Sequence, residues 1–312
     1  MEIGPYFNFS SEDFGEFAAM IKNGDVRQHL LDQGSFKGQI QLIQTQNMIL
    51  SSFSMSRKIL QQGYSSRGFI TFLIWNVDSD ASLYWKFHKM DNSSLPVVWQ
   101  KEHHSITEAG FNGLPVSFNE NFLKQYCGEH NKRHLVRMLE EQQLFKVDGV
   151  KLSQIRNKIK HIFSSDPEKL SIQEIKEIEL ELLNDIIHLL EKAPSFHQRT
   201  KKDQKMEVMD TFIHDNLREI KGISDLLEVF NIPERTIRYS FSKNFKMSPG
   251  KYIRQLKLNA VRRELLNDQS DVLIQDVAGA YNFWHMGQFS RYYSDLFGET
   301  PSETRKQNKP DS

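Results

Sequence analysis

The hydrophobic residues of this chain follow two different patterns, one before and one after about residue 122. In the first part, short apolar runs rich in Ile, Val, Phe and Trp alternate with turn residues such as Asn112-Gly113, which is typical of antiparallel strands. The runs cover residues 40–43, 48–53, 69–77, 83–87, 97–99 and 113–118. They predict a β unit over about 36–122, a small barrel or sandwich.

From about residue 123 to 192 the apolar positions recur at helical spacing. One helix face carries Leu135, Met138, Leu139 and Leu144, and another carries Leu152, Ile155, Ile159 and Ile162. Ser171 and Glu174 form a predicted capping box at the start of a helix that runs to about Lys192. Its narrow apolar seam consists of Ile175, Leu182 and Leu189, with Ile178 and Ile186 beside them. Such a seam packs within the chain or forms a homodimer through the Ser171–Lys192 helix, and both alternatives stay open.

Residues 194–203 are polar, basic and begin with Pro194, so they are the predicted linker. They separate a domain at 1–193 from a domain at 204–306. The second domain begins with an amphipathic helix that carries Met206, Met209, Phe212, Ile213 and Leu217. Two helix-turn-helix patterns follow, joined by a long helix from Pro249 to about Leu266. The fold class expected is therefore α+β, with a β domain and helices followed by an all-α domain.

In the first helix-turn-helix pattern, Ser224 is the expected cap of a short helix that ends at a turn at Asn231. Pro233 is expected at the first position of the second helix. Three apolar residues that repeat every four positions, Ile237, Phe241 and Phe245, must face the core. Residue types that read DNA grooves then face outward: Glu234, Arg235, Arg238, Tyr239 and Ser242.

The second pattern repeats this arrangement, with Ile274, Val277 and Ala278 on a short helix and a turn at Asn282. Phe289 and Tyr293 are expected to face inward on its second helix. The outward set is His285, Met286, Gln288, Ser290 and Arg291. Two such helices on one rigid connecting helix could enter successive major-groove segments about 34 Å apart without dimerisation.

Charge is distributed unevenly, although the chain as a whole has a net charge of zero. Residues 1–198 hold 21 basic and 24 acidic side chains, whereas residues 199–312 hold 19 and 16. Nine Lys or Arg residues and no acidic residue lie between 235 and 263: Arg235, Arg238, Lys243, Lys246, Lys251, Arg254, Lys257, Arg262 and Arg263. Such a cluster favours binding to the phosphates of duplex DNA, with Lys246 expected to contact the backbone.

Residues 206–305 resemble the DNA-binding domain of the AraC family of bacterial transcription regulators. The resemblance rests on the strings at 235–254, 258–266, 274–278 and 288–302, in this order and spacing. It implies that Arg235, Arg238 and Tyr239 meet bases and backbone. The family's turn glycines are Asn231 and Asn282 here, which keeps a left-handed turn accessible. The second recognition helix has Gly287 where a polar residue is common, so fewer base-specific hydrogen bonds are expected from it and Arg291 is assigned mainly to phosphate.

The resemblance also implies a role for the amino-terminal half. A cupin-like barrel would bind a small effector, the helices would mediate dimerisation, RNA polymerase would be a partner, and activation would be the usual outcome. The strings at 34–38, 60–63 and 110–118 are faintly similar to regulators of the ethanolamine-operon type but identify no ligand. Control by protein docking or sequestration at the β domain is the alternative to a small molecule.

An enzymatic role is not expected, and neither a cofactor nor a metal is predicted. His103 and His104 are adjacent, and adjacent strand residues point to opposite faces, so they would not chelate one ion. They are interpreted as surface or loop histidines. Cys127 lacks an orienting acid and is interpreted as a structural thiol. The aromatic residues of the β unit are assigned to its core, and they are Phe69, Phe72, Trp75, Tyr84, Trp85 and Phe87.

Length and composition fit this organisation. A chain of 312 residues, 38% of them apolar, can form about two domains with substantial cores. One cysteine cannot form an intramolecular disulfide, which favours a reducing compartment. The first residues are acidic and lack the basic start and apolar run of a signal peptide, so a cytoplasmic location is expected.

Overall fold

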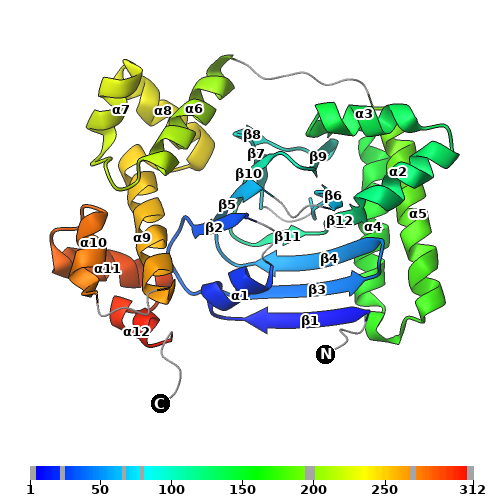
Figure 1. Ribbon diagram of the computed structural model, residues 1–312, viewed down its shortest axis with the longest axis horizontal. Helices are drawn as coiled ribbons and strands as arrows, with labels where there is room; N and C mark the ends of the chain where they lie inside the picture. Colours follow the sequence, from blue (N-terminus) through cyan, green and yellow to red (C-terminus); the bar gives the residue numbers. More distant parts are fainter. Residues whose placement is uncertain are drawn as a thin grey trace.

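The computed structural model describes residues 5–21, 25–64, 68–77, 81–193, 201–267 and 272–307. A β domain with helices on one side is followed by a domain that, in its described part, is entirely helical (Figure 1). The predicted fold class is therefore confirmed. Most of the predicted linker, residues 194–200, lies outside the described residues, and the helix after it already begins at Lys201. Residues 201–203, which the sequence assigned to the linker, are helical.

The β domain consists of two antiparallel sheets. One has the order β1-β3-β4-β12-β6-β9-β13, with β11 paired to β4, and the other has the order β2-β5-β10-β7-β8. The strands are β1 Tyr6–Ser11, β2 Arg27–Leu30, β3 Gly38–Gln44, β4 Met48–Met55, β5 Ile59–Tyr64, β6 Phe69–Phe72, β7 Leu83–Trp85, β8 His88–Lys89, β9 Ser94–Val98, β10 Glu102–Thr107, β11 Phe111–Gly113, β12 Val116–Asn119 and β13 Leu144–Lys146.

The β domain extends beyond the predicted range of 36–122. Strand β1, helix α1 (Phe14–Met20) and strand β2 precede it, and β1 pairs with β3 over its whole length. These strands were missed because neither contains a continuous apolar run. Leu144 was wrongly assigned to a helix face, since it begins β13, which pairs with β9. Pairing with a strand distant in sequence overrides the local helical spacing.

Four long helices cover one end of the first sheet (Figure 1): α2 Glu120–Glu129, α3 Arg133–Glu141, α4 Gly149–Ser164 and α5 Ile172–Glu191. The predicted capping box is present, because Ser171 Oγ accepts from Glu174 N and Ser171 N donates to the Glu174 carboxylate. The α5 seam residues Ile175, Leu182 and Leu189 are all buried in a core shared with the sheet. The seam therefore packs within the chain, the first of the two open alternatives.

The carboxyl-terminal helices are α6 Lys201–Asp215, α7 Ile223–Phe230, α8 Glu234–Phe245, α9 Pro249–Asn267, α10 Ile274–Ala280, α11 Met286–Phe297 and α12 Pro301–Lys306. Two predicted helix starts are off by one or two positions. Gly222, not Ser224, is the N-cap of α7, where the Asp225 carboxylate accepts from Gly222 N at 3.1 Å. Pro233 is the N-cap of α8 rather than its first residue. Both helix-turn-helix units otherwise form as predicted, and no helix within the described ranges has the length and apolarity needed to cross a membrane.

The two domains share hydrophobic cores. Met206, Ile237 and Phe245 pack with residues of β5, β7 and β10, and residues of α9 and α11 pack with α1 and the β sheets. In Figure 1, α9 runs along the side of the β domain, with α7 and α8 near one end of it and α10 and α11 near the other. The helical domain is thus seated on the β domain through both of its helix-turn-helix units.

Candidate nucleic-acid interface and interdomain cleft

Helix α8, the first recognition helix, has one buried and one exposed face. Ile237, Phe241 and Phe245 have no exposed surface, as their spacing predicts. The turn before the helix has Asn231 in the left-handed conformation at φ 46°, the geometry that replaces a turn glycine. The residues predicted to read DNA are all exposed, and they are Glu234, Arg235, Arg238, Tyr239 and Ser242. The helix therefore presents this set on one accessible surface.

Arg238 is held by a neighbour on the same helix. Its Nε donates to Glu234 Oε1 at 2.7 Å, and both side chains are about half exposed. The pair is a surface ion pair, which contributes little to stability but orients the guanidinium along the exposed face. Lys246 follows α8 as its left-handed C-cap and is exposed. Arg238 and Lys246 are therefore both accessible to a ligand.

Helix α11, the second recognition helix, presents a different surface. Phe289 and Tyr293 face inward, as predicted, and the turn residue Asn282 has φ 67°. His285 is the N-cap of the helix and is exposed, as are Gln288 and Arg291, whereas Met286 and Ser290 are only partly accessible. Gln288 Nε2 also donates to Tyr292 Oη at 2.9 Å. Met286 and Ser290 are therefore less available to a ligand than the sequence suggested.

Trp284 is a feature of this surface that the sequence analysis left out of its site residues. The side chain lies in the turn before α11 and is 74% exposed, the largest exposure among the large hydrophobic residues described. An indole in this position offers a flat apolar face and one N–H donor beside the start of the helix. Its place in the turn of the second unit, two residues after Asn282, was the sequence signal that could have identified it.

Three of the nine cations that the sequence assigned to DNA face the protein interior or the β domain instead. Lys257 is buried, and its Nζ donates to the backbone oxygens of Ile220 and Tyr281. Burial lowers the pKa of Lys257 to about 8. Arg262 is buried between Asp13 and Glu299, at 3.2 and 2.9 Å. The third, Arg263, faces the β domain, where its Nη1 lies 3.4 Å from Nδ1 of the buried His29.

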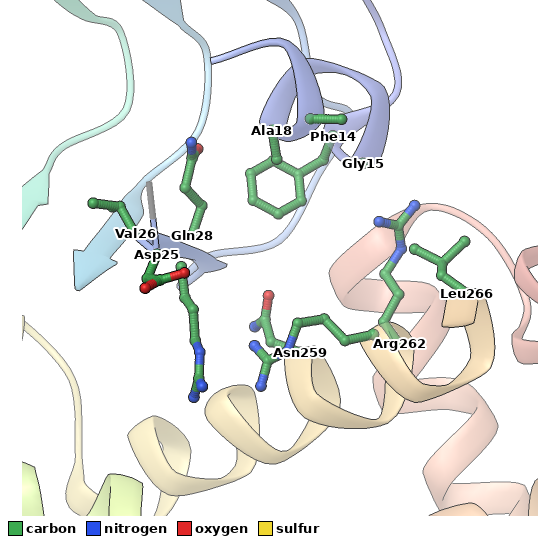
Figure 2. A pocket seen from close by; sticks show the side chains of 12 residues that line it. Phe14, Gly15, Ala18, Asp25, Val26, Gln28, Asn259, Arg262 and Leu266 are labelled. Carbon is green, nitrogen blue, oxygen red and sulfur yellow. The ribbon is translucent and has the colours of Figure 1, made fainter. Parts of the chain in front are cut away.

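A cleft of about 500 Å³ lies between α1, β2 and α9 (Figure 2). Phe14, Ala18 and Leu266 contribute apolar wall, and Arg27 and Arg263 contribute positive charge. Neither of these guanidinium groups has an ion-pair partner among the residues that the structure describes. Burial, followed by the nearby Arg27, lowers the pKa of Arg263, so the two positive charges are close enough to oppose each other. The arrangement provides a half-apolar, cationic site at the boundary of the two domains.

A polar cluster lies at the contact between the first helix-turn-helix unit and the β domain. His104 Nε2 is 3.1 Å from Asp210 Oδ2, and the other Asp210 oxygen accepts from Tyr252 Oη at 2.6 Å. The His29 and His214 rings are 5.6 Å apart. Burial lowers the pKa of both His29 and His214. These residues therefore form a buried polar contact between the domains.

The predicted surface position of His103 and His104 is wrong, because both are buried in β10. They do face different partners, since His103 Nε2 lies 2.7 Å from Ser105 Oγ while His104 faces Asp210. No three His, Cys, Asp or Glu side chains in the described part of the chain are arranged to hold a metal ion. Cys127 is fully buried in α2, and burial raises the pKa of its thiol to about 11, which leaves it unreactive.

A family model described as a helix-turn-helix domain matches residues 226–307, which contain α8, α9 and α11. XylDLEGF operon transcriptional activator 3 of Pseudomonas putida is 33% identical over 99 residues, which cover 31% of this chain and 30% of that protein. The HTH-type transcriptional activator RhaS of Pectobacterium carotovorum is 25% identical over 157 residues, 50% of this chain and 54% of that protein.

Among solved structures, a probable AraC family transcriptional regulator from Rhodopseudomonas palustris is 26% identical, with a TM-score of 0.31, over 33% of this chain and 94% of that one. Residues 226–307 therefore form a helix-turn-helix domain of the AraC type. The chain spans about a third of the length of the first curated relatives that it matches. Recognition of the family from the sequence is confirmed.

Proposed function

We propose that this protein is a sequence-specific DNA-binding transcription regulator that acts as an activator in the cytoplasm. The observation that carries the proposal is the two-sided structure of α8, whose inner face is fully buried while Arg235, Arg238 and Tyr239 are exposed together on an AraC-type domain. A folded core keeps the helix rigid, and the exposed polar face is left for base edges and phosphates. The relatives with matching domains are named as transcriptional activators.

Within this proposal the exposed residues have different roles. Arg238 reads a base, because a guanidinium on the outward face of a recognition helix can pair with guanine in bidentate fashion. Arg235, Tyr239 and Ser242 contact neighbouring bases and backbone, Glu234 orients Arg238, and Lys246 contacts phosphate. From the second helix, Gln288 and His285 are the candidates for bases, and Arg291 is assigned to phosphate. Met286 and Ser290 have a smaller role because they are partly covered.

We further propose that a small anionic effector binds the interdomain cleft. Arg27 and Arg263 would pair with its negative charge, and the wall formed by Phe14, Ala18 and Leu266 would cover its apolar part. Because the cleft is formed by both domains, a ligand there has different contacts when the domains move apart, which is the requirement for control of DNA affinity.

Two partner predictions belong to the same proposal. RNA polymerase is the expected partner of an activator of this family. A homodimer through the Ser171–Lys192 segment would have to use the outer face of α5, where Leu180 is 47% exposed, since the seam is occupied within the chain.

The test of DNA recognition is selection of bound duplexes from a random pool by the full-length protein at near-physiological salt, where nonspecific binding is weak. An enriched site with two blocks one helical turn apart is the expected result. An enriched site with only one block would mean that α11 does not contact bases specifically. Equal binding of all duplexes in the pool would contradict sequence-specific DNA recognition.

The effector is tested by thermal shift with a panel of small carboxylates and phosphates, on the wild-type protein and on Arg27→Ala. A stabilising anion whose effect disappears in Arg27→Ala supports the cleft. Stabilisation by a protein partner, with no response to any anion, would favour the alternative of control by docking at the β domain.

A further inference from the structure

Two adjacent residues of the β domain reach the carboxyl-terminal ends of both recognition helices. Arg57 and Lys58 form the turn between β4 and β5 and are only 3% and 5% exposed. Lys58 Nζ donates to the backbone oxygen of Phe245, the last residue of α8, at 2.8 Å. Arg57 Nη2 donates to the backbone oxygen of Leu296, in the last turn of α11, at 3.1 Å. We name these two side chains the helix-end clamp.

Both contacts are chemically favourable. The last four carbonyl oxygens of an α-helix have no partner within the helix, and they form the negative end of its dipole. A buried cation that donates to such an oxygen gains a charge-assisted hydrogen bond in a place that water does not reach. Both ends of the clamp have this arrangement, although α8 and α11 belong to different helix-turn-helix units.

The clamp is itself fixed within the β domain. The Asp32 carboxylate accepts from Arg57 Nε at 2.8 Å and from the backbone N of Lys58 at 3.0 Å. Lys58 Nζ is also 3.0 Å from Glu108 Oε1, and Arg57 donates to the backbone oxygens of Gly34 and Asp32. A single carboxylate thus holds the side chain of Arg57 and the backbone of Lys58.

The two units are also connected within the helical domain, where Tyr252 of α9 stacks on Phe245 at the end of α8 and Arg254 of α9 lies over the Tyr292 ring of α11. Helix α9 joins them in the chain, and Asn282 Nδ2 of the second turn donates to the backbone oxygen of Arg218, just before α7, at 2.6 Å. That contact lies at the amino-terminal side of α11. The clamp adds a second connection between the carboxyl-terminal ends of α8 and α11, and this one runs through the β domain.

We propose that Arg57 and Lys58 are positioning residues for DNA recognition, which set the relative orientation of the two recognition helices and hence the spacing between the two base blocks that the protein accepts. The inference rests on the proposed function. By this inference the β domain influences which DNA sites are bound although it does not contact the DNA.

The main experiment uses the full-length protein and the two-block site selected by the wild type, with the spacer between the blocks shortened or lengthened by one and two base pairs. Each base pair rotates the second block by about 35° and moves it by about 3.4 Å. We expect the wild type to lose about tenfold or more in affinity per altered spacer and Lys58→Met to lose only about two- to threefold, because unfixed helices adapt to the altered site.

Matched variants separate the clamp from the stability of the domain. Glu108→Gln removes the partner of Lys58 inside the β domain but leaves the bond to Phe245, so it should keep the wild-type spacing profile. Lys58→Arg retains a cation and should restore most of the spacing preference. A wild-type profile in folded Lys58→Met, or the same flattening in Glu108→Gln, would overturn the proposal.

A second measurement needs no DNA. Spin labels at Lys243→Cys and Asp295→Cys occupy exposed positions on α8 and α11, while Cys127 is buried and stays unlabelled. The label-to-label distance distribution should be narrow in the otherwise wild-type protein and broader when Lys58→Met is added. An unchanged distribution contradicts the clamp. If the wild type selects no DNA site, the proposed function fails, and this distance measurement alone decides on the clamp.

Discussion

The two recognition helices share an inner face and differ in their outer face. Both are twelve residues long, and the buried Ile237 and Phe241 of α8 correspond to Phe289 and Tyr293 of α11. On the outside, the positions of Arg235, Arg238 and Lys243 in α8 are taken by Gly287, Ser290 and Asp295 in α11. Helix α11 therefore has the same inward packing as α8 but fewer cations on its outer face.

This difference indicates that folding and recognition constrain different residues of the same helix. Packing requires large apolar side chains at fixed spacing, and both helices comply. Attraction to phosphate requires cations on the other side, and only α8 has several of them, whereas α11 has Arg291 beside the acidic Asp295. We therefore expect the first unit to provide most of the DNA affinity and of the base contacts. The second unit should mainly fix the position of the protein along the DNA.

The largest expected effect comes from breaking the inner face of the first unit. Phe241→Ala removes a fully buried ring that packs on Phe245 and Tyr252, so we expect a loss of about 3–5 kcal/mol in the free energy of unfolding. Urea unfolding of the full-length protein measures it, with the exposed Ser242→Ala as control. A loss below 1 kcal/mol would mean that the helix does not depend on this core.

The next effect concerns base reading by the outer faces. Arg238→Ala should reduce discrimination between the selected site and random duplex by about 1–3 kcal/mol, while nonspecific binding changes little. The matched change in α11, Ser290→Ala, should have a smaller effect because a partly covered hydroxyl replaces the guanidinium. Competition binding against both duplexes measures this. Equal losses on selected and random DNA for Arg238→Ala would refute its role.

Lower pH should weaken the contact between the first helix-turn-helix unit and the β domain more than the contact of the second unit. The pKa of His29 and of His214 is lowered in the folded protein by burial, so below the ordinary value of about 6.5 the unfolded or opened state binds protons that the folded state does not. Stability from these contacts is complete above that pH and is lost as pH falls below it. The charged or titratable groups that affect His29 are Arg263, His214, Arg27 and His104.

The second unit is seated by Arg262 between Asp13 and Glu299, and no histidine takes part in that contact. Hydrogen exchange of α6 and α8, corrected for intrinsic rates, should therefore increase more between pH 7 and pH 5.5 than exchange of α11 and α12. His214→Gln should reduce the difference. Equal increases in hydrogen exchange in all four helices would mean that the pH effect does not come from the histidines at the first unit.

The smallest effect is expected from phosphate contacts. Lys246→Ala should weaken binding to selected and random duplexes alike and reduce the slope of log affinity against log salt by about 1. Arg291→Ala should behave in the same way if Arg291 contacts phosphate only. A change in site preference for either variant would assign it to a base instead.

The sequence predicted the helical domain well because its signals are local. Asn231 and Asn282 in left-handed turns, Phe241 and Phe289 facing inward, and the long helix from Pro249 all follow from spacing within a few residues. The β domain was predicted less completely. Its strands β1 and β2 lack a continuous apolar run and pair with the distant strands Gly38–Gln44 and Ile59–Tyr64.

The exposed residues of the candidate site were predicted because their signals are local too. Exposed residues of α8 were correctly placed on its outer face, but charge counting could not separate Arg238, at the surface, from Lys257 and Arg262, inside. The partners of the buried cations are backbone oxygens and the distant Asp13. Contacts between residues from different elements leave no periodic trace in a sequence, and the same holds for the contacts of Arg57 and Lys58.

The position of Arg57 and Lys58 has a consequence for protein engineering. A chimera that joins residues 201–307 to a foreign sensor would keep every residue that faces DNA and the helix that joins the two units, but it would lose the two cations that lie behind the ends of α8 and α11. Such a hybrid should still recognise each short DNA block on its own and tolerate unnatural distances between them. The portable unit of recognition in this protein is larger than the domain that meets the DNA.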